Sequence, residues 1–234
     1  MKGLFVTGTD TDVGKTWISC LIARELAAGG HRVGVYKPAC SGSCDDGEGE
    51  YWPDLRALAA SLSPDVPLDR ICPQRFKEPL APPVAAAQAG RSVDARLLRD
   101  GVAWWTNECD VLIIEGVGGL LCPLTDDETI ADFAADLGFP LLTVARPNLG
   151  TINHTLLTLE ACRTRALNIA GVVLNNSRDQ AVDAQFVCSN AQQIESFDAT
   201  RVLGYCEFNG SEVLTIGSAD SADVDWFSLA SRAE

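Results

Sequence analysis

The sequence lacks a long hydrophobic run, because no apolar stretch approaches the ~20 residues that a helix needs to span a bilayer. It also lacks the start of a signal peptide, since MKGLFVTGTD turns polar too early. Basic residues are scarce: 18 Lys and Arg stand against 32 Asp and Glu, for a net charge of −14. An acidic surface repels nucleic acid and anionic lipid. We therefore expect no nucleic-acid or membrane partner, and we expect anionic ligands to be met by a few local cations.

The nine cysteines do not have the spacing of a disulfide framework. No CxxC occurs, and the one close pair, Cys40 and Cys44, has no histidine beside it to complete a metal cluster. An odd number of scattered cysteines indicates reduced thiols. We expect a cytoplasmic protein whose single buried cysteines behave as small apolar residues.

Apolar strands alternate with helical stretches along most of the chain. Strand-like runs fall at residues 3–8, 32–38, 110–116, 140–146, 168–175 and 201–205. Helical spacing falls at residues 15–30, 54–61, 94–107, 129–137, 151–165, 182–196 and 224–232. Continuous Val/Ile/Leu strands separated by helices indicate a parallel sheet covered on both faces. We predict one domain over residues 1–234 with an α/β fold of three layers, a mainly parallel central sheet, and a long loop at ACSGSCDDGEGEYWPD, residues 39–54.

Polar residues gather at the predicted carboxyl ends of the strands. In open parallel sheets, ligands bind beyond these ends. Residues 8–16 follow the first strand, Lys37 ends the second, and Glu115 closes the third. Arg146 follows the fourth strand, and the pair 175–176, both asparagine, follows the fifth. We predict that these residues form one site at one edge of the sheet.

The segment VTGTDTDVGKTW, residues 6–17, resembles a phosphate-binding loop with unusual spacing. In the pattern G-x-x-x-x-G-K-[ST], the first glycine should stand at residue 9. That residue is Thr9, and the glycine is Gly8. The alternative is a strand-to-helix turn whose GKT sequence arose by chance.

Three residues of this loop do the chemical work, and all lie after the irregular spacing. Gly14 lets the backbone approach an anion, Lys15 supplies a point charge for the β- and γ-phosphates, and the Thr16 hydroxyl ligates Mg²⁺. An extra residue upstream is therefore tolerated. Because the segment directly follows the first strand, we predict that the loop binds phosphate.

Three further residues are candidates for the reacting site. Lys37 ends a buried strand beside a proline, which favours a second cation near the γ-phosphate over a lysine that snorkels at the sheet rim. Glu115 closes an apolar strand before glycines, a position typical of a Mg²⁺ partner, although a cap or loop acid is the alternative. Asp54 is either a similar ligand or the N-cap of the helix DLRALAASL.

Taken together, the motifs GTDTDVGKT, YKPACSG, EGVGGL, LGTINHTLLTLEA and GVVLNN resemble the dethiobiotin synthetase family in order and spacing. The resemblance covers roughly residues 3–175 and weakens toward the C-terminus. The longer glycine spacing is the family's own form, and the family has a P-loop NTPase-like fold. The resemblance implies that Lys37 and Lys15 are catalytic, that Thr11 and Ser41 bind substrate, and that a Mg²⁺ cofactor is held by the following residues: Thr16, Asp54 and Glu115.

The resemblance also implies a nucleotide-binding set. Its members are Asp12, Val13, Gly14, Lys15, Thr16, Trp17, Asp54, Glu115, Gly116, Val117, Gly118, Asn175 and Asn176, together with Tyr205, Cys206 and Glu207 on a looser match. The segment GYCEF lacks the acidic residue and proline that the family often uses around adenine, so base preference is not predicted. Pro83 stands where many members have histidine, which predicts an altered pocket wall, and residues 209–234 do not align.

The implied reaction closes the ureido ring of dethiobiotin in biotin biosynthesis. The substrates are 7,8-diaminononanoate, CO2 and ATP, and the enzyme is a cyclo-ligase that forms C–N bonds. One amine captures CO2 as a carbamate, ATP phosphorylates it, and the second amine displaces phosphate. This chemistry needs positioning and electrostatic stabilisation rather than a protein nucleophile.

A homodimer is implied by the segment LGTINHT, residues 149–155. Its free helix N–H groups form an anion site. The resemblance implies that this site, at residues Gly150, Thr151, Ile152 and Asn153, takes the substrate carboxylate across the interface from the partner subunit. The alternative is an ordinary helix start with His154 as a polar residue on its first turn, and His31 is interpreted as structural.

Two other functions share parts of this pattern. A nucleotide-driven switch like the partitioning ATPases and the nitrogenase iron protein would carry a signature lysine at the position of Asp10, and no basic amphipathic tail is present. An amide-forming ligase related to the cobyrinate amidotransferases would need a glutaminase domain, for which this chain has no room. We expect dethiobiotin synthesis over either alternative.

Overall fold

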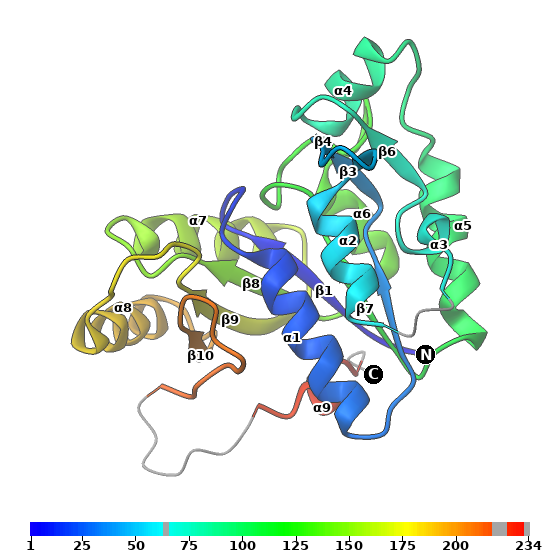
Figure 1. Cartoon of the computed structure of the whole chain (residues 1–234). Coiled ribbons are helices and arrows are strands. Elements are labelled where there is room, and N and C mark those ends of the chain that lie inside the picture. Colours follow the sequence, from blue (N-terminus) through cyan, green and yellow to red (C-terminus); the bar gives the residue numbers. More distant parts are fainter. Residues whose placement is uncertain (63–65, 217–223, 232–234) are drawn as a thin grey trace.

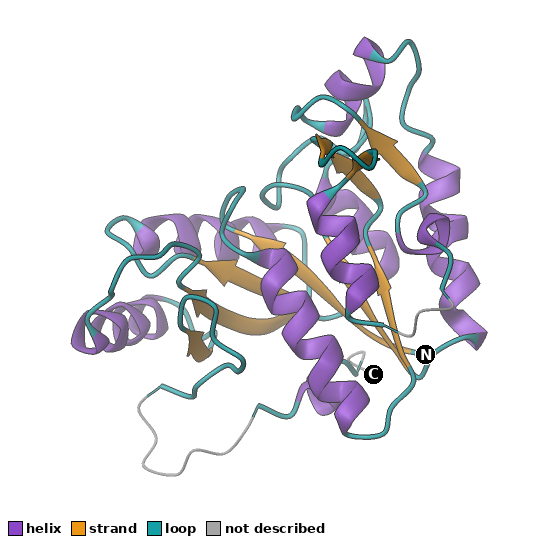
Figure 2. Ribbon diagram, viewed as in Figure 1, coloured by secondary structure: helices purple, strands orange, loops and turns teal. Residues whose placement is uncertain are grey.

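A six-stranded sheet forms the centre of the protein (Figures 1 and 2). The computed structural model describes residues 1–62, 66–216 and 224–231. Every neighbouring pair in this sheet is parallel, and the order across it is β10-β9-β8-β1-β7-β2. The strands are β1 (Lys2–Gly8), β2 (Val33–Tyr36), β7 (Val111–Glu115), β8 (Leu141–Ala145), β9 (Ile169–Asn175) and β10 (Val202–Cys206). The parallel sheet predicted from the Val/Ile/Leu runs is confirmed.

Helices cover both faces of the sheet, and Figure 1 shows α1 and α2 on its near side and α6 on its far side. The longer helices are α1 (Lys15–Ala28), α2 (Pro53–Ala60), α5 (Ala95–Trp104), α6 (Ile130–Leu137), α7 (Thr151–Thr164) and α8 (Ala184–Phe197). Each matches a helix predicted from the spacing of apolar residues, with ends that shift by up to three residues. A single turn of 3-10 helix, η1 (Trp105–Asn107), follows α5 within the predicted helix 94–107.

The core lies on both faces of the strands. Leu4, Phe5 and Val6 of β1 are fully buried, because a parallel strand covered by helices has no solvent face. Phe133 of α6 meets Phe5 edge to face, with 6.3 Å between ring centroids. A second apolar cluster fills the space between β8, β9, α7 and α8, with Leu159, Leu174 and Ile194 among its members.

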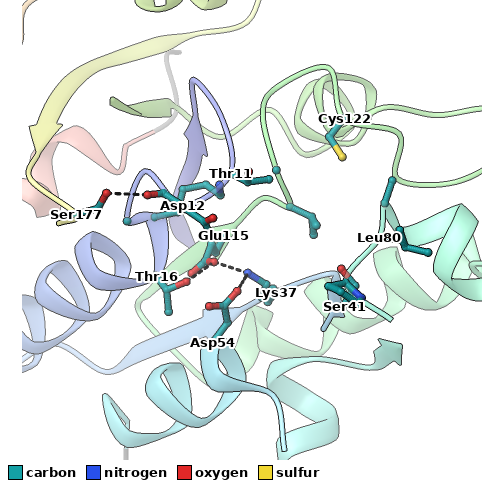
Figure 3. A pocket seen from close by; sticks show the side chains of 16 residues that line it. Thr11, Asp12, Thr16, Lys37, Ser41, Asp54, Leu80, Glu115, Cys122 and Ser177 are labelled. Atoms are coloured by element: carbon teal, nitrogen blue, oxygen red, sulfur yellow. Dashed lines mark hydrogen bonds and ion pairs between the residues drawn. The ribbon is translucent and has the colours of Figure 1, made fainter. Parts of the chain in front are cut away.

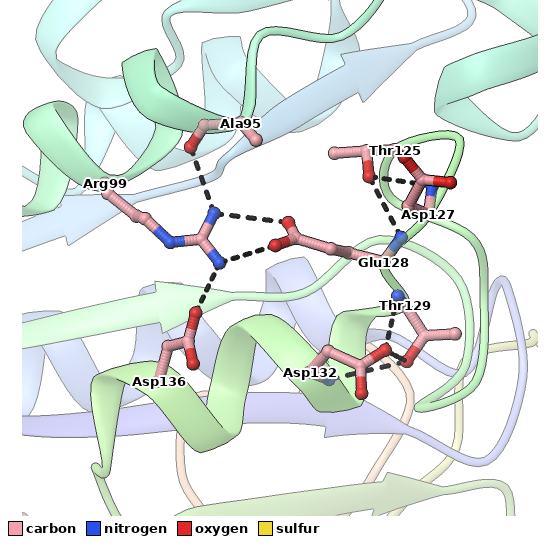
Figure 4. Close-up of polar contacts among 8 residues, drawn as sticks. All are labelled: Ala95, Arg99, Thr125, Asp127, Glu128, Thr129, Asp132 and Asp136. Carbon is pink, nitrogen blue, oxygen red and sulfur yellow. Dashed lines mark hydrogen bonds and ion pairs between the residues drawn. The ribbon is translucent and has the colours of Figure 1, made fainter.

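The start of α6 is fixed by a capping box (Figure 4). Thr129 accepts from the Asp132 backbone, and the Asp132 carboxylate accepts from the Thr129 N–H at 2.8 Å. Beside it, the Arg99 guanidinium of α5 donates to both oxygens of Glu128 at 2.9 and 3.2 Å and also pairs with Asp136. These bonds join α5 to α6 on one side of the sheet.

The loop predicted over residues 39–54 is wrong in part, because it contains three short strands. β3 (Ala39–Ser41) pairs in parallel with β6 (Gln74–Phe76), and β4 (Cys44–Asp45) pairs antiparallel with β5 (Glu50–Tyr51). Strands of two or three residues are too short to show a period of two, so the sequence pattern could not reveal them. The helices α3 (Leu68–Ile71) and α4 (Pro82–Gln88) were also missed.

The C-terminal helix is shorter than the predicted stretch 224–232. It is α9 (Trp226–Leu229), and Arg232 lies outside the described residues. The Trp226 indole donates to the Glu25 carboxylate of α1 at 2.9 Å, and the Gly3 N–H donates to the Ala230 carbonyl at 2.9 Å. These bonds dock α9 against α1 and β1.

The cysteines agree with the expectation of reduced thiols. All nine cysteines lie in the described part of the chain, and all are free thiols. Within residues 1–62, 66–216 and 224–231, no helix combines the length and the apolar character needed to cross a membrane.

Two neighbouring leucines of α5 test how this helix packs on the sheet. Leu98 is fully buried, whereas 41% of Leu97 is exposed. We expect Leu98→Ala to lower the free energy of unfolding by about 2–5 kcal/mol, because it leaves a cavity in the core. Leu97→Ala makes the same chemical change on the same helix and should cost under about 1 kcal/mol. Urea denaturation of both variants measures the difference, and equal losses would contradict this packing.

Candidate active site

A cavity of about 680 Å³ lies beyond the carboxyl ends of β1, β2 and β7 (Figure 3). It brings together residues that are far apart in the sequence, as the strand-end argument predicted. The residues that line it are Thr11, Asp12, Gly14, Lys15, Thr16, Lys37, Ser41, Pro79, Leu80, Ala81, Asp54, Glu115, Val117, Gly118, Cys122 and Ser177.

The phosphate loop joins β1 to α1 at the floor of this cavity. Gly14 precedes α1 with φ of 90°, a left-handed conformation that favours glycine. A Cβ at this position would overlap the side-chain amide of Asn175, so the close approach of β9 also requires glycine. Asp12 is left-handed as well, with φ of 55°, and lies within the irregular stretch between Gly8 and Gly14.

Lys15 folds back over the loop. Only 7% of the residue is exposed, and its Nζ donates to the Asp10 carbonyl at 3.0 Å. Burial and, to a smaller extent, the nearby charge of Lys37 lower the pKa of Lys15 to about 8. An anion in the cavity would offset both effects, because it favours the charged ammonium.

Lys37 connects the acidic residues of the site. Its Nζ donates to Asp54 Oδ2 at 2.7 Å and pairs with Glu115 Oε1. Thr16 Oγ1 donates to the same Glu115 oxygen at 2.8 Å. Lys37 and Glu115 are 3% and 1% exposed, so the pair is shielded from water.

Two opposing effects set the protonation of this network. Burial acts to lower the pKa of Lys37, but the carboxylates of Glu115 and Asp54 outweigh it and hold the pKa well above its ordinary value. The Lys37 charge in turn lowers the pKa of Asp54. Lys37 is therefore a charged ammonium and Asp54 a carboxylate near neutral pH.

The oxygen atoms around Lys37 fit the requirements of Mg²⁺. Glu115 Oε2 is buried without a hydrogen-bond partner in the described structure, and carboxylate and hydroxyl oxygens are the ligands that this ion prefers. Among the described residues, no three His, Cys, Asp or Glu side chains form a metal cluster by themselves.

The structure decides between the two interpretations of Asp54. The N-cap of α2 is Trp52, followed by Pro53, and Asp54 lies in the first turn. Its carboxylate accepts from Lys37 instead of capping the helix. The N-cap interpretation of Asp54 is therefore wrong.

Several predicted nucleotide-binding residues surround the cavity rather than line it. The Gly116 N–H donates to the Val6 carbonyl, and Val13 is buried in the core. The Asn175 amide donates to the Val13 carbonyl at 2.8 Å, and the Asn176 amide donates to the Gln180 carbonyl.

Trp17 contacts the segment that follows β10, away from the lining of the main cavity. The Trp17 indole donates to the Gly210 carbonyl at 3.0 Å. Tyr205 pairs through its backbone with Leu214, which folds the chain after β10 back on itself. Cys206 is the last residue of β10 and Glu207 follows it, and both lie outside the described lining of the main cavity.

The helix start at residues 149–155 lies outside this cavity. Gly150 precedes α7 with φ of 95°, and the Thr151 hydroxyl is buried with no partner in the described structure. A separate cavity of about 210 Å³ is lined by Thr9, Asp10, Arg146, Asn148, Leu149, Thr151 and His154. Ile152 and Asn153 line neither space in the described part of the chain.

Sequence reasoning missed part of the cavity wall. Pro79, Leu80, Ala81, Cys122 and Ser177 line it without having been singled out. The signal was the proline-rich EPLAPP segment, from which only Pro83 was taken. Pro83 lies in α4, outside the described lining.

His31 makes a packing contact of the kind that a structural role requires. Its ring stacks on Phe227 with 3.9 Å between centroids.

Comparison with known proteins identifies the family. A family model described as an AAA domain matches residues 2–211. The chain is 40% identical over 213 residues to the ATP-dependent dethiobiotin synthetase BioD of Bacillus cereus strain B4264, covering 91% of this chain and 86% of the relative. It is 45% identical over 177 residues to the protein of the same name from Anaeromyxobacter sp. strain Fw109-5, covering 76% and 78%.

The fold is shared more widely than the family. The MinC:MinD cell division protein complex of Aquifex aeolicus matches with a TM-score of 0.55 and 15% identity, covering 88% of this chain and 81% of the other. At this identity the likeness shows the P-loop NTPase fold alone. With relatives 40–45% identical over most of its length, the chain belongs to the ATP-dependent dethiobiotin synthetase family.

Proposed function

We propose that this chain closes the ureido ring of dethiobiotin from 7,8-diaminononanoate, CO2 and ATP, releasing ADP and phosphate. It is thus a cyclo-ligase of biotin biosynthesis that forms C–N bonds. The observation that carries the proposal is the buried Lys37 ammonium, which lies beside a phosphate loop in a chain of this family. We also propose that residues 1–234 act as one domain, because the loop and the cations come from one sheet.

The reaction proceeds in three balanced steps. One amine adds to CO2 and loses a proton, which gives a carbamate. A carbamate oxygen attacks the γ-phosphorus of ATP, and the bond to the ADP oxygen breaks. The second amine then attacks the carbonyl carbon of the mixed anhydride, phosphate leaves, and loss of a proton completes the ring.

Lys15 and Lys37 stabilise the charge that develops on the transferring phosphoryl group. Both ammonium groups line the same cavity, and both are shielded from water, where electrostatic interactions are stronger. The N–H groups at the start of α1 add an anion site between them. Thr11 and Ser41 also line this cavity, which supports a role for them in holding the diamine.

Thr16, Asp54 and Glu115 would hold Mg²⁺. When bound, the ion supplies positive charge that neutralises the phosphate oxygens. The buried, unpartnered Glu115 Oε2 supports this assignment. Lys37 competes for the same carboxylates, so these residues also keep its ammonium charged and aimed at the cavity.

We assign the substrate carboxylate to the start of α7 in the second subunit of a homodimer. Residues 150–153 lie outside the main cavity of their own chain, which supports a role in a neighbouring chain. Leu149 and Leu157 near this helix start are 96% and 62% exposed, as expected of a face that a second copy covers. Such a dimer would use the same patch on both sides.

The two alternative functions receive less support. The likeness to MinD is one of fold at 15% identity, whereas the dethiobiotin synthetases match at 40% and more. Asp10 stands where the switch ATPases carry their signature lysine, and its carboxylate lies 3.4 Å from the Arg146 guanidinium. The amide-forming ligase would need a further domain.

Incorporation of labelled bicarbonate tests the proposed reaction. We expect label to enter an acid-stable product only when both the diamine and ATP are present, with one phosphate released per ring. Lys15→Ala should abolish it, because the variant loses a charge directed at the β- and γ-phosphates. Lys77→Ala removes an exposed lysine and serves as the control. Incorporation without nucleotide, or with Lys15→Ala at the normal rate, would contradict the proposal.

Lys37→Gln separates transition-state stabilisation from binding. If Lys37 acts on the transferring phosphoryl group, kcat should fall about 100-fold or more, while the Kd for ATP changes less than about tenfold. Steady-state kinetics and calorimetric titration measure the two quantities, with Lys77→Gln as the matched control. Weak ATP binding with an intact kcat would make Lys37 a ground-state contact only.

The methyl ester of the diamine tests the site at the start of α7. The ester lacks the carboxylate charge. The interaction of such a charge with a helix N-terminus contributes ~0.3–1 kcal/mol, and hydrogen bonds from the N–H groups add to it. We therefore expect the ester to bind the enzyme at least about fivefold more weakly than the acid. ATP affinity should not change. Light scattering during chromatography should show a dimer. Equal binding of acid and ester, or full activity of a monomer, would show that residues 150–153 only begin a helix.

A further inference from the structure

Four consecutive carbonyl groups of the phosphate loop each accept a hydrogen bond from a side chain. They belong to residues 10–13, between β1 and α1. The four donors are Lys15 Nζ to the Asp10 carbonyl (3.0 Å), Arg146 Nη2 to Thr11 (2.9 Å), Ser177 Oγ to Asp12 (2.7 Å) and Asn175 Nδ2 to Val13 (2.8 Å). Three of the four donors are not part of the motif, so side chains from other parts of the chain hold the loop together with Lys15.

Three of the donors come from one half of the sheet. Arg146 follows β8, Asn175 ends β9, and Ser177 comes two residues later. Figure 3 shows the Ser177 hydroxyl directed at Asp12, on the side of the cavity away from Lys37. The loop thus receives its support from β8 and β9, whereas Lys37 and Glu115 come from β2 and β7.

A hydrogen bond that orients a backbone carbonyl also orients the N–H group of the next residue. Each peptide unit is planar and trans, so a carbonyl that points outward turns the N–H of the next residue inward. The bonds to Thr11, Asp12 and Val13 therefore orient the N–H groups of Asp12, Val13 and Gly14. These three N–H groups have no acceptor among the described residues. Successive N–H groups turned to one side form an anion-binding nest.

We propose that Arg146 and Ser177 are positioning residues that hold the phosphate loop in its anion-binding form. They act through the backbone, and the inference rests on the proposed function because the anion is the nucleotide phosphate. Lys15 and Asn175 are less informative, since both are already assigned to the nucleotide. Arg146 also faces Asp10 Oδ2, but at 3.4 Å that contact is longer than its bond to the Thr11 carbonyl.

Loss of either bond should loosen the loop and weaken nucleotide binding. We expect Arg146→Ala and Ser177→Ala each to raise the Kd for Mg·ADP and the KM for ATP by about 3- to 10-fold, the range for one lost hydrogen bond. The kcat should change much less, because the loop binds phosphate in the ground state and in the transition state alike. Ser177→Ala removes no charge, so its effect separates positioning from a change in the electrostatic field.

Conservative and remote variants provide the controls. Ser177→Thr and Arg146→Lys keep a donor and should restore most of the affinity. Ser196→Ala and Arg165→Ala each remove an exposed side-chain bond to a helix carbonyl elsewhere and should bind Mg·ADP like the original chain. The Kd is measured by calorimetric titration of Mg·ADP, and thermal melting of each variant reports its folded state.

The outcomes distinguish this inference from the proposed function. Weaker binding in both alanine variants, restored in the conservative ones, supports it. Unchanged Kd in both alanine variants would overturn it, as would a lower Tm and kcat with unchanged Kd, which indicates a role in stability alone. If the original chain itself fails to bind Mg·ADP, the proposed function fails and this inference fails with it.

Discussion

The buried ammonium of Lys37 is the constraint on which the site depends. A charge that is 3% exposed is tolerated only when it is paired, because removal from water costs several kcal/mol. Its partners Asp54 and Glu115 come from α2 and β7, while Lys37 itself follows β2, so one network joins three elements. Thr16 extends it to α1. Loss of either carboxylate would therefore disturb both the position and the charge of Lys37.

The residues at the two sides of β1 in the sheet have different contacts. Lys37 follows β2 and Glu115 ends β7, and these are the groups that we propose act around the phosphoryl group. Strands β8 and β9 end near Arg146, Asn175 and Ser177, which donate hydrogen bonds to backbone carbonyls of the loop. Because β1 lies between the two halves, the loop after β1 has Lys37 and Glu115 on one side. On its other side lie the side chains that donate hydrogen bonds to its carbonyl groups. The strand order produces this division directly.

Much of this arrangement could be predicted from the sequence, and the failures have a common cause. Lys37 and Glu115 come at the carboxyl ends of continuous apolar runs, and in a parallel sheet these ends meet at one edge. Ser177, Cys122 and residues 79–81 lie outside the apolar runs that predicted the strands, so the pattern did not place them, although all five line the cavity. The short strands β3 and β6 were missed for the same reason. The sequence pattern therefore predicts where the residues at the ends of the main strands lie. The positions of loop residues and of short strands depend on tertiary packing.

Gly14 illustrates how one motif position can answer two demands. Its place in the pattern is usually explained by the ligand, since a bare backbone lets phosphate approach. Here a Cβ would also overlap the Asn175 amide, which reaches in from β9 to hold the Val13 carbonyl. A side chain at Gly14 would therefore displace the support of the loop before any nucleotide arrived. Glycine is therefore required at this position both for the contact with Asn175 and for the approach of the anion. The two requirements coincide because the peptide unit between Val13 and Gly14 accepts from Asn175 through its carbonyl and directs its N–H group to the anion.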